Sequence, residues 1–533
     1  MDLGMQLYQS NTTVDIRSSK NTEVDAIEIE AAFTLALSVL LMCCSAVAYQ
    51  IKERKLYFMP DSAGTILVGV AASAIMALLG HNFSSYLTIV PGIAFYALLP
   101  LIVFEAGYCF ECSIEFMQNL FPILMYATIG AMISTFIIGY SVFYFAKWGL
   151  ITSGIDTLNP MEALMFGALI SSTDPIATLS IMGNPELNCD ETLYSLVFGE
   201  SVLNDAVSIV LFKTFEFYYH QHITDFGLDD RASVLIKFCI IAAFSMFIGL
   251  GMGLFQSYIY KHSHVSNYPT MELSVLFLFC YCTYSVAQSL SLSGVMALFI
   301  NGIIVSHYNS YNLSEDSYTT SEHVFSTAAS LAEHLLFLCM GLFTCSGLLK
   351  DNWNIKFALW GLLFSFIARG VSVGCLSWVS NLVRTRSKKI SGPMQVVLWW
   401  AGLRGAIAFA LSMNMPGPNK DTYAAVTLSI CLFTTFVCGG LTDTVLGKMG
   451  MKQEEQSNDA FPRENTTLMP GVRKTTRFAK SVGMYGLLKM QHSTVRRLDV
   501  AVRETAEYAW QNFDETYLRP LFGGDEIRNS RYG

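Results

Sequence analysis

Two carboxylates and one amide interrupt an apolar segment of the chain, residues 198–212 (FGESVLNDAVSIVLF). A helix has about 3.6 residues per turn, so Ser201, Asp205 and Ser208 share one face and place a carboxylate between two hydroxyl groups. Oxygen ligands of this kind suit a hard cation. An ionised side chain at the centre of a bilayer is costly, so such a carboxylate either lines a pathway or pairs with a cation. Asp205 is therefore the candidate ligand of a monovalent cation such as Na+ or K+.

Glu200 belongs to the same segment but is directed elsewhere around the helix, and it needs a cationic partner of its own to stay charged. Arg369 and Arg404 also fall within apolar runs and are the candidate partners. Either carboxylate would serve packing alone if it formed a salt bridge. For Asp205 this alternative is the weaker one, because its neighbour is the neutral Asn204 and no basic residue lies within a turn on its face.

Residues 171–175 (SSTDP) interrupt a second apolar run. Proline lacks an amide donor and clashes with the preceding turn, while Ser, Thr and Asp side chains compete for backbone groups, so two half-helices are expected. Asp174 would be the N-cap of the second half and Pro175 its first residue. The carbonyls freed near Thr173 would be cation ligands, because such groups are tolerated in hydrocarbon only where they are buried or line a site. The alternative is a proline kink without a ligand role.

The composition places these segments in a membrane. Of 533 residues, 53% are hydrophobic and only 14% are charged, against roughly 25% charged in soluble domains. Apolar runs long enough to cross a bilayer recur along the chain. Basic residues after the first run, from Lys52 to Lys55, place the amino end outside and the carboxyl tail inside. The sequence predicts an all-α polytopic membrane protein with about 13 transmembrane helices, near residues 28–50, 62–80, 86–108, 119–147, 162–183, 191–218, 233–260, 269–289, 291–308, 322–349, 355–383, 392–413 and 422–447.

The twelfth of these spans carries a further interruption. Residues 399–406 (WWAGLRGA) place Arg404 beside two glycines, which weaken a helix and allow another segment to approach closely. If spans one to six and eight to thirteen are inverted halves joined by the seventh, the interrupted fifth and twelfth spans hold corresponding places. Interrupted segments at matching positions are typical of a transporter site at a repeat interface.

Four sequences, FGESVLNDAVSIVLF, SSTDPIAT, GLRGAIAFALS and FEAGY, together resemble the eukaryotic sodium/proton exchangers of the monovalent cation/proton antiporter superfamily. The resemblance implies an inverted-repeat fold in which discontinuous spans five and twelve cross, a homodimer, and elevator-like movement. The moving core would hold spans 4–6 and 11–13, the dimerisation domain spans 1–3 and 8–10, and span 7 would link them. The expected organisation is an outward or luminal segment (1–27), the antiporter domain (28–450) and a cytosolic tail (451–533).

The resemblance also implies roles for single residues. One departure concerns the third span, where many members carry two prolines before the acidic AGY-type sequence and this chain has Pro100 followed by Leu101. Carried over position by position, Asp205 would be the carboxylate that binds cation and proton, with Asn204 as its neutral neighbour. Thr173 and Asp174 would belong to the unwound crossing, and Arg404 to the second crossing. Glu200 and Arg369 would form a structural ion pair.

A single titrating carboxylate would make the exchange electroneutral. Asp205 is neutral with one bound Na+, K+ or Li+ and with one bound proton, whereas the bare carboxylate would carry a buried charge and stall. Further ligand oxygens are expected from Ser201, Ser208 and the carbonyls near Thr173. No cofactor and no nucleic-acid partner is expected. The competing interpretations are a cation channel and a non-transporting membrane sensor, while an intramembrane aspartyl protease is disfavoured because Asp174 and Asp205 lack the Tyr-Asp and Gly-x-Gly-Asp contexts of that class.

The tail contains two helical patterns and one family-like motif. Basic residues between Arg473 and Lys480 indicate an interfacial helix against anionic lipid. An apolar stripe from Leu498 to Phe513 would dock on the transport domain or on a regulatory protein. Residues 513–524 (FDETYLRPLFGG) resemble the endosomal and vacuolar branch of the family. An endosomal, Golgi or vacuolar membrane is therefore expected in preference to the plasma membrane.

Overall fold

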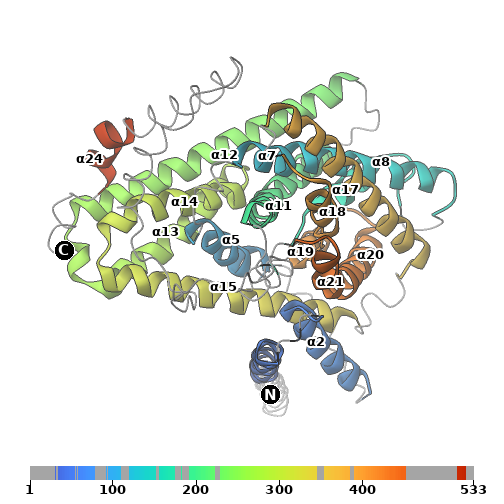
Figure 1. Cartoon of the computed structure of the whole chain (residues 1–533), viewed down its shortest axis with the longest axis horizontal. Coiled ribbons are helices and arrows are strands. Elements are labelled where there is room, and N and C mark those ends of the chain that lie inside the picture. The colour runs from blue at the N-terminus through green and yellow to red at the C-terminus, as the bar shows by residue number, and fades with distance from the viewer. Residues whose placement is uncertain are drawn as a thin grey trace, which may run out of the picture.

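Helices make up every regular element that the computed structural model describes (Figure 1). Nine of the described helices are long and apolar enough to cross a bilayer, and two shorter apolar helices accompany them. The all-α polytopic membrane fold is thereby confirmed. The residues described are 31, 34–54, 56, 58–78, 92, 94–109, 119–151, 155–174, 182, 191–221, 228–344, 353–384, 389–451 and 513–523.

Every predicted span coincides with one or more helical elements, in the same order along the chain. Which face of the membrane each connection occupies stays a prediction. The elements are Thr34–Glu53, α2 (Asp61–Leu78), η1 (Ala94–Leu98) with α5 (Leu99–Tyr108), α7 (Leu120–Met125) with η2 (Tyr126–Gly130) and α8 (Ala131–Lys147), α9 (Met161–Ser171), α11 (Glu191–His220), α12 (Leu228–His262), η3 (Val265–Asn267), α13 (Pro269–Ser289), α14 (Gly294–Asn312), α15 (Glu315–Thr344), α17 (Ile355–Val383), α18 (Gly392–Trp400) with α19 (Ala406–Ser412), and α20 (Lys420–Phe433) with η5 (Thr434–Gly439) and α21 (Gly440–Lys448).

The fifth and twelfth spans are interrupted, as the sequence predicts. Helix α9 ends at Ser171, and Ser172 has an extended backbone. The expected second half-helix, with Asp174 as its N-cap, begins at Pro175 and lies outside the described residues. In the twelfth span, α18 ends at Trp400 and α19 begins at Ala406. The two breaks cross, because the backbone N–H of Asp174 donates to the carbonyl of Leu403 at 2.8 Å.

The helices pack in two groups. In Figure 1, α8, α17 and α20 of the first group lie on the right, and α13 and α14 of the second lie on the left. In the first, α9 packs on α8, α11 and α19, and α17 packs on α8 and α20. In the second, α14 packs on α5, α12 and α13, and α15 packs on α2 and α5. Helix α11 lies between them and contacts α9 on one side and α12 and α14 on the other.

Helix α9 is the centre of the first group, and all of its residues are buried. Its contact with α8 depends on a glycine. A Cβ atom on Gly167 would lie 2.4 Å from the carbonyl oxygen of Thr135 in α8. Such an approach is possible only without a side chain, and small residues serve the same purpose at helix interfaces in other membrane proteins. The sequence thus lets α9 fit closely against α8 and hold its broken end beside α11.

Two π-helical segments, η2 and η5, lie within the fourth and thirteenth spans and flank the site. Such segments widen a helix locally and are frequent at functional sites. The Tyr126 hydroxyl in η2 hydrogen-bonds to the Ser377 hydroxyl of α17 at 2.6 Å. The Thr434 hydroxyl in η5 accepts a hydrogen bond from the backbone N–H of Arg404 at 3.2 Å. Each segment therefore turns a side chain toward a neighbouring span.

Candidate functional site

Asp205 is buried on α11, beside the broken end of α9. The hydroxyl of Ser172, the first residue after α9, donates to Asp205 Oδ1 at 2.6 Å. Within the described part of the chain, this is the one hydrogen bond to the carboxylate. Asp174 and Arg404 are the charged groups whose fields act on it. One oxygen of the carboxylate is therefore oriented by a hydroxyl group from a different span.

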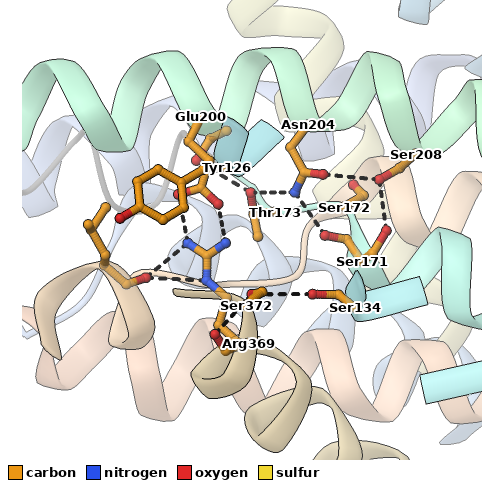
Figure 2. Close-up of polar contacts among 12 residues, drawn as sticks. Tyr126, Ser134, Ser171, Ser172, Thr173, Glu200, Asn204, Ser208, Arg369 and Ser372 are labelled. Carbon is orange, nitrogen blue, oxygen red and sulfur yellow. Dashed lines mark hydrogen bonds and ion pairs between the residues drawn. The ribbon is translucent and has the colours of Figure 1, made fainter. Parts of the chain in front are cut away.

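Asn204 joins α11 to the same break, as Figure 2 shows. Its Nδ2 donates to the Ser171 carbonyl at 2.8 Å and to the Thr173 hydroxyl at 3.1 Å. Its Oδ1 accepts a hydrogen bond from the Ser208 hydroxyl at 3.3 Å. All four polar positions of this network are buried. The amide therefore has fixed orientation, with its donors used by the backbone and hydroxyl groups of the break.

The two serines expected to flank Asp205 lie elsewhere in the network. The Ser208 hydroxyl is turned toward Asn204 and toward the Ser171 hydroxyl, which is 3.0 Å away. The reason is helical geometry, since Asn204 and Ser208 are four residues apart and stack along the helix axis. The Ser201 hydroxyl accepts a long hydrogen bond, 3.5 Å, from the Thr173 hydroxyl. The hydroxyl that contacts Asp205 comes instead from Ser172, on a different span.

Arg404 donates hydrogen bonds to backbone carbonyl groups at the end of α9. Its Nη1 donates to the carbonyls of Ser171 at 2.9 Å and Ser172 at 3.0 Å. The last carbonyls of a helix lack partners within it and form the negative end of its dipole, so a guanidinium group is well matched to them. Two of the carbonyls near Thr173, those of Ser171 and Ser172, thus accept hydrogen bonds from the protein's own donors, and Asn204 also donates to the Ser171 carbonyl. The role of these carbonyls as cation ligands stays a prediction.

Glu200 and Arg369 form a second polar unit next to the first (Figure 2). Arg369 Nη1 pairs with Glu200 Oε1, and Nη2 donates to Oε2 at 2.9 Å. Both side chains are nearly buried, with 2% of Glu200 and 8% of Arg369 exposed. The guanidinium also donates to the Leu398 carbonyl from Nη2, at 2.9 Å, and from Nε, at 3.3 Å. This bidentate ion pair connects α11 to α17, and the hydrogen bonds to Leu398 connect α17 to the end of α18.

The structure therefore gives the two candidate arginines different partners. Arg369 serves Glu200, and Arg404 serves the end of α9. The sequence did not single out Ser171, Ser172 or Thr434, although all three belong to the network. For the two serines the hydroxyl-rich run before Pro175 was a usable signal. For Thr434 the sequence offers none, because its contact with the Arg404 backbone depends on how η5 packs.

Known proteins are similar to this chain over most of its length. The family model described as "Sodium/hydrogen exchanger, transmembrane" matches residues 37–448, which include every residue of the site. Sodium/hydrogen exchanger 1 of Arabidopsis thaliana is 30% identical over 538 residues, and the match covers 96% of each chain. Sodium/hydrogen exchanger 8 of Rattus norvegicus is 29% identical over 504 residues, covering 93% of this chain and 84% of the relative.

A solved structure shares the fold. The sodium proton antiporter of Methanocaldococcus jannaschii, solved at pH 8, aligns with a TM-score of 0.57 at 19% sequence identity. The alignment covers 78% of this chain and 98% of the archaeal one. At this level of identity the match speaks for the arrangement of helices.

Proposed function

This chain belongs to the sodium/hydrogen exchanger family, and from that premise we propose that it exchanges one monovalent cation for one proton at Asp205 without moving net charge. As a family member it is a multi-pass membrane transporter for which Na+ and H+ are the expected substrates, rather than an enzyme. The observation that carries the proposal is the position of Asp205, which is buried, bonded to Ser172 and adjacent to a neutral amide.

The charges around the site support a single titrating group. Glu200 is paired with Arg369. Asp174 and Arg404, the two charged groups that act on Asp205, have opposite signs. Of the two carboxylates, Glu200 is held by an arginine, and Asp205 is held by the hydroxyl of Ser172. A bound cation or a bound proton neutralises it, whereas the bare form leaves a charge in a site shielded from water, which is costly.

Coupling follows from this cost. The neutral forms, loaded with cation or proton, cross the membrane, and the bare form does not. Proton and cation therefore compete for one site, and each is carried only in exchange for the other. Na+, K+ and Li+ are all compatible with a carboxylate oxygen supplemented by hydroxyl groups. Asn204 preserves the balance because it keeps the adjacent position uncharged while holding the break in place.

The movement proposed is an elevator-like displacement of the first helix group against the second. Helix α11 carries Asp205 and would move with the first group (α7–α9 and α17–α21). Helix α12, which packs with the second group, would be the link, and the rest of that group (α2, α5 and α13–α15) would belong to the dimerisation domain. The packing of the helices into two groups supports this division. The resemblance of residues 513–524 to the endosomal and vacuolar branch supports an endosomal, Golgi or vacuolar membrane, where exchange would set pH and cation content.

Proteoliposomes with an internal pH dye test the proposal. Addition of Na+, K+ or Li+ outside should move protons in the opposite direction, saturate with cation concentration and rank the three ions. The Asp205→Asn variant should show no cation-driven pH change, while Asp421→Asn, at an exposed acid of α20, should behave as the native chain. A conductance that does not saturate and is not coupled to pH would identify a channel, and a chain that moves neither ion would identify a sensor.

A further inference from the structure

A short piece of the tail lies against the membrane-spanning part of the protein. Residues 513–523 comprise Phe513, the π-helical turn η6 (Asp514–Leu518), the helical turn α24 (Arg519–Phe522) and Gly523. In Figure 1, α24 is drawn beside α12, and the two elements are in contact. The basic pattern of residues 473–480 and most of the apolar stripe that precedes this piece lie outside the described residues.

Among the side chains of this piece that the structure describes, Asp514 is the most deeply buried, with 5% of it exposed. The Tyr308 hydroxyl of α14 donates to its Oδ1 at 2.7 Å. His307 Nε2 is 3.4 Å from Oδ2, and Arg519 Nε donates to the same oxygen at 3.2 Å. A carboxylate shielded from water is stable only when such donors compensate it. Two of the three donors belong to α14 and one to the tail itself.

A second set of contacts consists of hydrogen bonds to the backbone carbonyls of α24. Lys261 Nζ, at the end of α12, donates to the carbonyl of Arg519 at 3.0 Å and to that of Pro520 at 2.7 Å. Asn312 Nδ2, at the end of α14, donates to the carbonyl of Phe522 at 2.7 Å. The Arg519 carbonyl also accepts a hydrogen bond from the Gly523 amide at 2.9 Å. The last carbonyls of a helical turn lack partners within it, so Lys261 and Asn312 supply donors to those of Pro520 and Phe522.

Aromatic side chains add to the contact of α24 with α12 and α14. The ring of Phe522 meets Tyr308 of α14 and Tyr258 of α12, with ring centroids 6.1 Å and 6.5 Å apart. The anchors on both helices thus converge on one short piece of chain. Asn312 also donates to the Ser257 carbonyl of α12 at 3.3 Å, so the same amide joins the two helices and the tail.

We propose that Tyr258, Lys261, His307, Tyr308 and Asn312 form a docking site for the chain's own residues 513–523, with Asp514 as the contact that decides whether the site is occupied. Phe513, Tyr517 and Leu521 are 48%, 61% and 52% exposed, so little apolar surface is buried. Polar anchors around one carboxylate hold the piece instead. Regions with few buried apolar contacts open at low free-energy cost, and loss of that carboxylate therefore releases the whole piece.

The docking site lies on α12 and α14, and both of these helices contact α11, which carries Asp205. The tail is thus attached to α12, the proposed link, and to α14 of the proposed dimerisation domain. Its release would remove these contacts from the ends of both helices. A modification or a partner that draws residues 513–523 away would act on the transporter from this point.

Hydrogen–deuterium exchange of the full-length protein in lipid nanodiscs tests the proposal. In the native chain, amides of residues 513–523 should exchange at least about tenfold more slowly than in a free peptide of the same sequence. Asp514→Ala should abolish this protection, and Tyr308→Phe, which removes one donor, should weaken it by about tenfold, the range expected for a hydrogen bond to a charged group. Asp421→Asn, far from the site, should leave it unchanged.

Two results would overturn the proposal: native residues 513–523 that exchange as fast as the free peptide, or protection that survives in both Asp514→Ala and Tyr308→Phe. Exchange of α11 in the same samples shows whether a variant has unfolded. Hydrogen–deuterium exchange does not depend on ion transport. A failure of the docking proposal is therefore distinguishable from a failure of the proposed cation/proton exchange.

Discussion

Gly405 in the second interrupted span lies directly against the carboxylate of Asp174 in the first. A Cβ atom on Gly405 would be 2.2 Å from Asp174 Oδ2 and 2.5 Å from its Cβ, closer than any side chain tolerates. The crossing is also held by the hydrogen bond from the Asp174 amide to the Leu403 carbonyl. The geometry of the whole site therefore depends on the absence of one side chain.

Replacing this glycine should disrupt the crossing. Gly405→Ala should lower exchange by at least about tenfold, because a shift of about 1 Å in a site can cost far more than that. Cation-driven pH change in proteoliposomes measures the effect. Gly374→Ala is the control, because a Cβ there would meet nothing within 4 Å. Full activity of Gly405→Ala would show that the crossing adapts and that its close contact is unimportant.

Glu200 and Arg369 should behave as a unit. Removing one partner of a buried ion pair leaves an uncompensated charge and costs roughly 3 to 5 kcal/mol, so Glu200→Gln should lower the midpoint of thermal unfolding markedly. The double variant Glu200→Gln with Arg369→Gln should unfold at a higher temperature than either single variant. Asp61→Asn, which breaks an ion pair with the exposed Lys52, should change little. Strictly additive effects of the two substitutions would contradict the pairing.

Asn204 should have two separable roles. Asn204→Ala removes its hydrogen bonds to the Ser171 carbonyl and the Thr173 hydroxyl, so exchange should fall but stay insensitive to voltage. Asn204→Asp removes the same donors and adds a charge to the cycle, so the residual exchange should respond to membrane potential. Exchange under clamped and free potential distinguishes the two variants. Equal voltage responses in both would count against the charge argument.

Ser172 should bias the competition between cation and proton. Its hydroxyl donates to Asp205 Oδ1 at 2.6 Å, and a hydrogen bond donated to a carboxylate favours the ionised form that binds a cation. Ser172→Ala should therefore favour the proton and raise the apparent KM for Na+ by at least about tenfold, because a hydrogen bond to a charged group contributes roughly 1.5–3 kcal/mol and about 1.4 kcal/mol is a factor of ten. The maximal rate should change less.

The KM of Ser365→Ala provides the control, because that hydroxyl donates only to its own helix, at the Leu362 carbonyl. An unchanged KM in Ser172→Ala would mean that this hydroxyl is not part of the ion site. A loss of maximal rate without a change in KM would assign Ser172 to the crossing rather than to binding.

The sequence could predict features that depend on local chemistry. Hydrophobic runs locate the spans, and the positions of Pro175 and of the glycines around Arg404 locate both breaks, because these residues act on their own stretch of backbone. The burial of Asp205 follows from the apolar run around it. Its role as the ion ligand stays a prediction.

Partnerships between distant spans could not be predicted from residue spacing alone. Spacing left Arg369 and Arg404 as candidates for Glu200, and the resemblance to the exchanger family was what pointed to Arg369, which the structure pairs with Glu200. Ser208 shares a helical face with Asp205, yet its hydroxyl bonds to Asn204 and Ser171. Side-chain torsions and packing between spans make these choices, and neither is visible in residue spacing.

The most direct test of the central claim is proton release on cation binding. Purified protein in weakly buffered solution with a pH dye, at a pH at which the site is protonated, is given NaCl, with choline chloride as the blank. Because the cation binds the deprotonated carboxylate, the native chain should release about one proton, and Asp205→Asn none. Release that persists in Asp205→Asn, or Na+ binding to the native chain without release, would contradict exchange at a single shared carboxylate.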